Sequence, residues 1–233
     1  MDLFSNSDQN FLKDRFHESW YDELSNYINN DFAFGQMWSE IEKLRKEKVI
    51  YPDDEDVFKI FKLPLDQVKV VIIGQDPYFN GNADGIAFSC KKDYSPSLKQ
   101  ILFAMKNDVQ PVNPSPQMNL NYLVEQGVFL YNPILTVEEG KPLSHENIGW
   151  KDFSIKVFNA LNRVDDLVWL LWGKKAQEFN ARSYNLSHHI LQAEHPAFAA
   201  RNNKIWIVNH FSQVNKFLIS KNKEEIQWLK QKL

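Results

Sequence analysis

The chain contains 233 residues, of which 43% are hydrophobic, 14% aromatic and 24% charged, and its formal net charge is −3. This composition excludes an intrinsically disordered chain, a collagen-like repeat and a coiled coil, and it is sufficient for a sizeable core. Because no apolar run approaches the ~18 residues of a membrane span and the N-terminus lacks a secretory core, we expect a cytoplasmic protein with no membrane partner. Nucleic-acid binding would require a local basic patch, since the chain as a whole is weakly acidic.

The first third of the sequence has the hydrophobic periodicity of amphipathic helices. Apolar residues recur three or four positions apart from Trp20 to Ile28, and the same spacing continues from Phe34 to Leu44. We therefore predict that this part of the chain forms helices that pack on the core.

Four short apolar runs follow, and each is rich in β-branched or aromatic residues, which favours strands. They cover residues 68–73, 128–131, 167–172 and 189–191. Their continuous apolar character indicates burial on both faces. The segments between them have the length and periodicity of crossover helices, at residues 98–106, 150–161 and 173–179. We predict an α/β fold in which a parallel sheet lies between helices, as one domain over residues 1–233.

Two further segments lie outside this alternation. The Pro-rich stretch 111–116 is typical of a surface loop, and the amphipathic segment 224–233 is expected to dock Ile226 and Leu229 on the core. The single cysteine, Cys90, cannot form an internal disulfide. The sequence also lacks the Cys and His spacings of zinc sites, so we expect no metal and no other cofactor.

Polar side chains follow the predicted strands, at the edge where parallel α/β sheets bind ligands. Asp76 comes after the first strand, and Asn132 comes after the second. Lys174 and Lys175 come after the third strand, and His195 comes after the fourth. One carboxylate, one amide and one imidazole from three strands are therefore expected to converge on one crevice, which would suit a small molecule or a nucleobase.

Each of these residues also has a structural interpretation when it is taken alone. Asp76 and Asn132 each precede a proline, which fits a turn or a strand end that satisfies backbone groups. His195 fits a hydrogen-bonded turn. Lys174 and Lys175 fit either a solvated surface or a phosphate clamp, and the sequence does not separate the two. Three nearby aromatic residues are core residues by default, namely Tyr78, Phe88 and Trp172.

Several ordered strings bear on these alternatives, among them VVIIGQDPY, GIAFSC, PSLKQI, YNPILTV, SHENIGW, LLWGKKAQ and EHPAFAAR. Their order and spacing, over about residues 50–215, resemble those of family 1 uracil-DNA glycosylases. The family string GQDPYH is matched in five of six positions, with Phe79 in place of the histidine, whereas HPSPLS is matched only in its leading His-Pro. The resemblance implies a three-layer α/β/α domain with a central four-stranded parallel sheet.

The resemblance also implies an activity, the release of uracil from single- or double-stranded DNA with formation of an abasic site. Breaking the N-glycosidic bond puts positive charge on the sugar and negative charge on the base. By resemblance, Asp76 orients the attacking water and faces the sugar. A neutral His195 and the backbone of Gln75 stabilise the charge on uracil O2.

Three further residues are implied to select the base. Asn132 corresponds to the amide that reads the N3–H and O4 edge of uracil and mismatches the exocyclic amine of cytosine. Phe88 stacks on the extruded base. Tyr78 occupies the space that the methyl group of thymine needs.

The resemblance implies contacts to the phosphates around an extruded nucleotide as well. Two strings match phosphate-binding loops of the family, and they contain Pro96 and Ser97 in one case and Ser144 and His145 in the other. We expect these four residues to contact DNA.

The third such loop departs from the family pattern. Ala197 stands at a phosphate-contacting serine, Phe198 at a proline, and Ala199 at the leucine that fills the vacated space in the duplex. We therefore expect lower activity on double-stranded than on single-stranded DNA. Phe198 either replaces the leucine as the inserted side chain or packs inward as a loop aromatic, and the sequence leaves both open.

Two functions follow from these observations. The first is a monofunctional uracil-DNA glycosylase that acts as a monomer. The alternative, which the altered HPSPLS string would fit, is a catalytically weak glycosylase-like factor that binds DNA or another protein. The resemblance adds one expected protein partner, a DNA-mimicking inhibitor of the kind known for this family.

Overall fold

The computed structural model describes residues 13–179 and 185–231, and its centre is a four-stranded parallel sheet. The strand order is β4 (Val128–Tyr131), β2 (Val70–Ile73), β6 (Val168–Trp172) and β7 (His189–Ala193). Neighbouring strands are parallel throughout, and Ile72 lies opposite Leu130 on one side and Leu170 on the other. Each strand overlaps a predicted run, so the predicted strands and the α/β class are confirmed.

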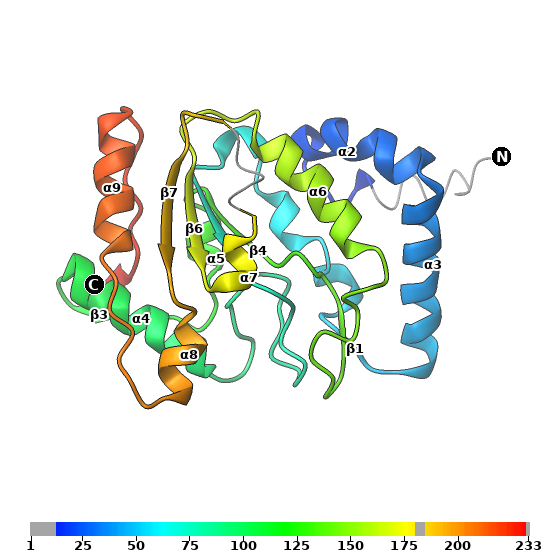
Figure 1. Cartoon of the computed structure of the whole chain (residues 1–233), viewed down its shortest axis with the longest axis horizontal. Coiled ribbons are helices and arrows are strands. Elements are labelled where there is room, and N and C mark those ends of the chain that lie inside the picture. Colours follow the sequence, from blue (N-terminus) through cyan, green and yellow to red (C-terminus); the bar gives the residue numbers. More distant parts are fainter. Residues whose placement is uncertain (1–12, 180–184, 232–233) are drawn as a thin grey trace.

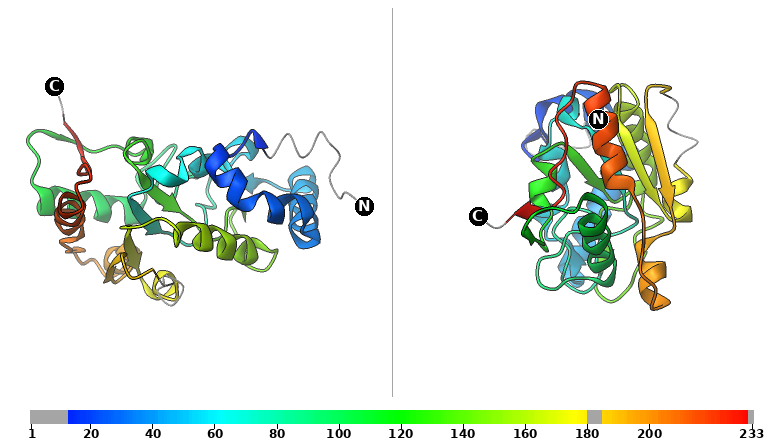
Figure 2. Two further views of the ribbon diagram at one scale, coloured as in Figure 1. Left: turned by 90° about the horizontal axis from the view of Figure 1, so that it is seen from above. Right: turned by 90° about the vertical axis from the view of Figure 1, so that its left-hand side faces the viewer.

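Helices cover both faces of this sheet, which makes three layers (Figures 1 and 2). α2 (Glu18–Asn30) and α6 (Trp150–Leu161) lie on one face, and α4 (Pro96–Val109) and α9 (His210–Ser220) lie on the other. α3 (Phe32–Glu47) lies at the opposite end of the molecule from α9 (Figure 1). In the described part of the chain, no helix is long and apolar enough to cross a membrane.

The remaining elements are short. They are β1 (Ile50–Tyr51), η1 (Asp54–Asp56), η2 (Lys59–Lys62), η3 (Leu65–Gln67), β3 (Pro114–Ser115), α5 (Asn121–Val124), β5 (Val137–Glu138), α7 (Lys174–Gln177), α8 (Pro196–Arg201) and β8 (Lys230–Gln231). β1 pairs with β5, and β3 pairs with β8, both in antiparallel fashion.

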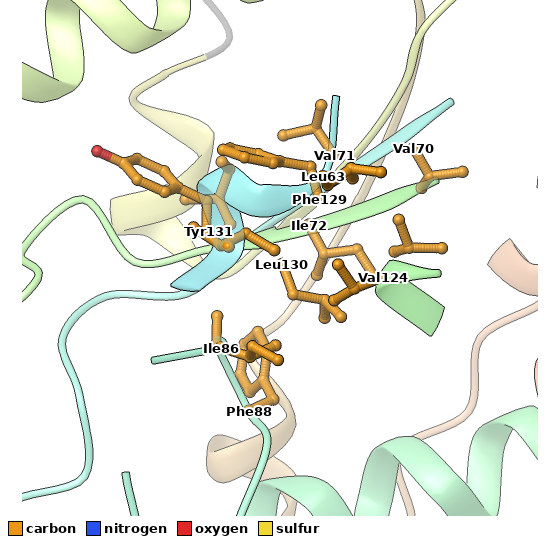
Figure 3. Close-up of a cluster of buried hydrophobic side chains, with 14 of the residues drawn as sticks. Leu63, Val70, Val71, Ile72, Ile86, Phe88, Val124, Phe129, Leu130 and Tyr131 are labelled. Atoms are coloured by element: carbon orange, nitrogen blue, oxygen red, sulfur yellow. The ribbon is translucent and has the colours of Figure 1, made fainter. Parts of the chain in front are cut away.

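The core follows the pleat of the sheet, which places alternate residues on opposite faces. On the face covered by α2, Trp20 stacks on Phe129 with their rings 5.0 Å apart. Figure 3 shows Phe129 and Tyr131 on one side of β2 and β4, and Leu130 and Phe88 on the other. Phe88, an aromatic residue predicted to contact the base, therefore lies on the face of the sheet opposite Trp20 and Phe129.

The C-terminal segment docks as predicted, since Ile226 and Leu229 are 1% and 2% exposed. Its backbone is extended up to β8, which pairs with β3 inside the Pro-rich surface stretch 111–116. Residues 232–233 of the predicted segment lie outside the described residues. The helix expected over 173–179 is shorter, because α7 covers only Lys174–Gln177, and α8 and α9 have no counterpart in the sequence prediction.

Candidate active site

The residues predicted to act on the base line a single cavity of about 430 Å³, namely Gln75, Asp76, Tyr78, Phe88, Asn132 and His195. Asp76 follows β2, Asn132 follows β4 and His195 follows β7, so the cavity lies at the carboxyl ends of the strands. The structure thus brings the carboxylate, the carboxamide and the imidazole together, while their chemical roles stay predictions. Within the described ranges, no three His, Cys, Asp or Glu side chains are grouped as a metal site.

Two glycines make room for these side chains where β2 and β6 end. A Cβ atom on Gly74 would lie 2.1 Å from Asn132 Oδ1, and a Cβ atom on Gly173 would lie 2.8 Å from His195 Cβ. Gly173 also has a φ of +87°, which residues with a side chain rarely adopt. The amide and the imidazole therefore reach the cavity because the neighbouring strands end in glycine.

The His195 ring is held in one tautomer by the start of α8. Its Nδ1 accepts a hydrogen bond of 3.1 Å from the backbone N–H of Ala197 and so caps the helix. Burial, together with the positive charge of Arg201, lowers the pKa of His195 from 6.5 to about 4. At neutral pH the ring is therefore uncharged, and because Nδ1 is an acceptor, the proton is on Nε2.

The Asp76 carboxylate is fixed by a backbone donor from a distant loop. Asp76 Oδ2 accepts a hydrogen bond of 2.7 Å from the N–H of Leu143. Burial raises the pKa of Asp76, and this hydrogen bond opposes the increase. Leu143 has a φ of +61°, a conformation that is costly for leucine and that recurs at functional sites. This contact could not be predicted from the sequence, because a backbone N–H has no side-chain signature.

Two aromatic side chains form a rigid wall of the cavity. The Phe88 ring lies 5.8 Å from the His195 ring and 5.7 Å from the Trp172 ring. The Tyr78 hydroxyl shares a hydrogen bond of 2.6 Å with Ser95 Oγ, which also caps α4. Tyr78 is thereby tied to the start of a long helix, which limits its movement away from the cavity.

The Asn132 carboxamide is available to a ligand. Among the described residues it has no hydrogen-bond partner, although it lines the cavity. The N–H of Gln75 likewise makes no hydrogen bond in the described part of the chain, whereas its C=O accepts from the N–H of Ile134. The Asn132 carboxamide and the backbone N–H of Gln75 therefore keep free hydrogen-bonding capacity, and both residues line the cavity.

Asp84 is a positioning residue that the sequence interpretation missed. It is 1% exposed, and its carboxylate accepts hydrogen bonds from Ile86 N–H at 3.2 Å, Ser89 Oγ at 2.5 Å and Asn119 Nδ2 at 3.0 Å. Two of these donors flank Phe88, which has a φ of +64°. Asp84 therefore holds the turn that presents the Phe88 ring.

The four residues expected to contact phosphates lie in different environments. Pro96 is exposed at the first turn of α4, and Ser97 is 9% exposed and lines the cavity. Ser144 is exposed, and its Oγ accepts from the N–H of Glu138 at 2.8 Å. His145 is 2% exposed, and its ring is hydrogen-bonded to Thr136 at 2.8 Å. The structure therefore places His145 in the interior, where its side chain is not accessible for the predicted contact to DNA.

The altered third loop forms the short helix α8. Ala199 is 7% exposed and belongs to the core, so the position that aligns with the family's leucine does not reach the surface. Phe198 is 43% exposed, which excludes the inward packing left open by the sequence. Ala197 and Arg201, one turn apart on α8, both line the cavity.

Comparison of the sequence with known proteins identifies related chains over most of its length. A family model described as the uracil DNA glycosylase superfamily matches residues 61–219. A uracil-DNA glycosylase from Buchnera aphidicola is 40% identical over 220 residues, which are 90% of this chain and 97% of the relative. A uracil-DNA glycosylase from Coxiella burnetii is 37% identical over 225 residues, with 94% and 93% of the two chains covered.

Solved structures have a similar fold. The crystal structure of mimivirus uracil-DNA glycosylase has a TM-score of 0.82 at 24% identity, covering 93% of this chain and 88% of that one. A variant of mimivirus UNG, solved in complex with UGI, also has a TM-score of 0.82, at 25% identity and with 93% and 90% of the chains covered. The α/β architecture, the family model and the close relatives lead to the same assignment, and the chain belongs to the uracil DNA glycosylase superfamily.

Proposed function

We propose that this chain hydrolyses the N-glycosidic bond of deoxyuridine in DNA, releasing uracil and leaving an abasic site. The observation that carries the proposal is that a carboxylate, an unpaired carboxamide and a neutral imidazole, from three parallel strands, line one cavity. Membership of the uracil DNA glycosylase superfamily supports the same activity.

The reaction separates charge, and the cavity has groups for both signs. As the bond between C1′ and N1 breaks, the sugar becomes cationic and the base anionic. Asp76 faces the sugar and orients the water whose oxygen attacks C1′. His195 donates a hydrogen bond from Nε2–H to uracil O2, and the free N–H of Gln75 assists at the same oxygen. Because His195 is already neutral, it stabilises the anion without first losing a proton.

Selection of the base rests on hydrogen bonding and on volume. The Asn132 carboxamide accepts from N3–H and donates to O4 of uracil, whereas cytosine presents the opposite pattern and leaves both groups unpaired. Phe88 stacks on the base. Tyr78, held through Ser95, blocks the space beside C5 where thymine carries its methyl group.

The proposal is tested with three single-stranded oligonucleotides that differ only in having one uracil, cytosine or thymine. We expect alkali-labile strand breaks from the uracil substrate alone, together with free uracil detected by chromatography. Absence of product at enzyme concentrations above that of the substrate would reject the proposal and favour a glycosylase-like binding factor.

Tyr78→Ala is expected to make the enzyme release thymine, which the wild-type enzyme leaves intact. The substitution removes the ring beside C5 without touching Asp76, Asn132 or His195. A hydrophobic pocket discriminates one methyl group by only about 10- to 200-fold, so relief of the steric block should make thymine release measurable. The assay uses a thymine oligonucleotide at long incubation times, and Tyr78→Phe, which keeps the ring, serves as the control with no thymine release.

Gly74→Ala is expected to lower kcat/KM for uracil release about 10- to 100-fold, because the new methyl group displaces the Asn132 carboxamide. A double-mutant cycle with Asn132→Ala identifies the route of this effect. If the loss passes through Asn132, the double variant is no slower than Asn132→Ala alone. Fully additive losses would mean that Gly74 acts in another way.

We propose that Phe198 replaces the leucine of the family as the side chain that fills the vacated space in duplex DNA. It is exposed on α8, next to the cavity-lining Ala197. Phe198→Ala is expected to lower the rate on double-stranded uracil DNA about tenfold, with little change on single strands, because only the duplex needs the base held out of the stack.

The matched control is Phe103→Ala, since Phe103 on α4 is also 43% exposed and does not line the cavity. Equal losses on both strand forms, or an equal loss in the control, would remove Phe198 from the duplex-opening role. Wild-type enzyme is expected to act faster on single-stranded than on double-stranded substrate.

A further inference from the structure

Three cations lie on the wall of the active-site cavity, and we call them the cationic edge, made of Lys174, Lys175 and Arg201. Asp76 is the only carboxylate among the residues that line this cavity in the described chain. The chain as a whole has a net charge of −3. The positive charge is therefore concentrated locally, at the place where a polyanion would enter.

Two of the three cations have no acidic partner in the part of the chain that the structure describes. Lys175 Nζ lies 3.7 Å from Glu146 Oε1, so part of its charge is already compensated. Neither Lys174 nor Arg201 forms an ion pair within the described ranges, and both are exposed. Two long cationic side chains at the mouth of a site, each without a partner, are free to bind an anion.

The cationic edge is assembled by the same contact that positions His195. Gly173, which precedes Lys174, approaches His195 so closely that a Cβ atom would lie 2.8 Å from His195 Cβ. Arg201 lies on α8, which His195 caps, and its charge contributes to the lowered pKa of His195. Lys174 thus follows the glycine that lies against His195, and Arg201 lies at the end of α8, close enough to His195 for its charge to act on that ring.

The position of Arg201 relative to Ala197 indicates that the anion is a phosphate. The two residues share one face of α8 and both line the cavity. Ala197 has no hydroxyl to donate to a phosphate, and its backbone N–H is already hydrogen-bonded to His195 Nδ1. Arg201, one turn further along, has a guanidinium group that binds a phosphate through two parallel hydrogen bonds.

We propose that Lys174 and Arg201 together bind one backbone phosphate of the uracil-bearing strand and so replace the hydroxyl contact that Ala197 cannot make. This inference rests on the proposed function for the identity of the strand. On this side of the cavity the enzyme thus binds the DNA backbone through ion pairs instead of a hydrogen bond from a neutral hydroxyl. Its affinity for DNA consequently decreases more steeply with salt concentration than the affinity of an enzyme with the hydroxyl contact.

The test measures binding and not turnover, so that its outcome is independent of the catalytic proposal. The probe is a fluorescent single-stranded oligonucleotide with one 2′-fluoro-deoxyuridine, whose fluorine disfavours the cationic sugar and prevents cleavage. A second set of probes carries one uncharged methylphosphonate at each of the phosphates nearest the uridine. Dissociation constants are measured by anisotropy over a range of NaCl concentrations.

For the double variant Lys174→Gln/Arg201→Gln, we expect a Kd about tenfold higher than that of the wild type at moderate salt. The slope of log Kd against log salt should fall by about 0.7, the value for one phosphate of a single strand. One methylphosphonate position should weaken wild-type binding about tenfold and leave the double variant unaffected. That non-additivity identifies the phosphate.

Two controls make the result decisive. Lys43→Gln/Lys46→Gln removes the same charge from α3, at the other end of the molecule, and should keep the wild-type methylphosphonate profile (Figure 1). Lys174→Arg retains both charges and the Arg201 guanidinium group, and it should bind within threefold of wild type. A methylphosphonate profile shared by wild type and Lys174→Gln/Arg201→Gln would overturn the inference, as would an equal loss in the α3 control or a tenfold loss in the charge-retaining variant.

Discussion

An Asp76→Asn enzyme is expected to release uracil from single-stranded DNA about a thousandfold more slowly than the wild-type enzyme. Asparagine has nearly the shape of aspartate, and its carbonyl oxygen can still accept the Leu143 hydrogen bond, which is 2.7 Å long in the wild type. It has no negative charge to face the cationic sugar and holds the attacking water less strongly. The measurement is the single-turnover rate of strand breaks after alkali treatment.

The matched control is Asp66→Asn, which makes the same chemical change at an exposed residue of η3 and should keep the wild-type rate. Binding of the 2′-fluoro oligonucleotide should change little in Asp76→Asn, because the loss is in the transition state and not in the ground state. Equal rates for Asp76→Asn and wild type would remove the carboxylate from the mechanism.

The order of strands and helices could be predicted because each strand is a continuous apolar run. β4 and α6 begin and end at the predicted residues, 128–131 and 150–161. β7 extends two residues further than predicted, to Ala193, because its pairing with Trp172 of β6 determines where it ends. Sequence pattern specifies which side chains are buried, whereas the length of an edge strand depends on its neighbour.

α8 (Pro196–Arg201) could not be predicted from hydrophobic periodicity, because it has only 6 residues, fewer than two helical turns. Its start depends on the side chain of His195, an unusual cap, and on the packing of Ala199 in the core. The family resemblance predicts a loop here, in which residue 199 corresponds to the leucine that fills the vacated space in the duplex. The helix instead buries Ala199 and exposes Phe198, so the surface residue differs from the aligned one.

The convergence of Asp76, Asn132 and His195 on one cavity could be predicted because each residue follows a predicted strand. The carboxyl ends of parallel strands lie at the same edge of the sheet. The interior position of His145 had no such signal. Its ring bonds to Thr136, whose hydroxyl also accepts from Trp150 Nε1 at 2.7 Å, and this network depends on the tertiary fold. The support of Phe88 by Asp84 was missed for the same reason.

His195→Asn is expected to lower kcat for uracil release about 100- to 1000-fold while α8 stays folded. Asparagine is a favoured N-cap residue, so its side-chain oxygen can take over the hydrogen bond from Ala197 N–H. Its side chain is too short to place a donor where Nε2–H lies. The variant therefore separates the capping role of His195 from its role toward uracil O2, and single-turnover rates on the uracil oligonucleotide measure the latter.

The same variant is expected to lose less stability in acid than the wild-type protein does. The pKa of His195 is about 4 in the folded chain and 6.5 by reference. As pH falls from 6.5 to 4, the unfolded chain binds a proton at this histidine and the folded chain does not, so the free energy of unfolding decreases. This contribution is about 2 to 3 kcal/mol for a half-buried ring. Urea unfolding at pH 7 and pH 4 should therefore show a smaller decrease for His195→Asn, and an identical decrease in both proteins would contradict a neutral His195 at the head of α8.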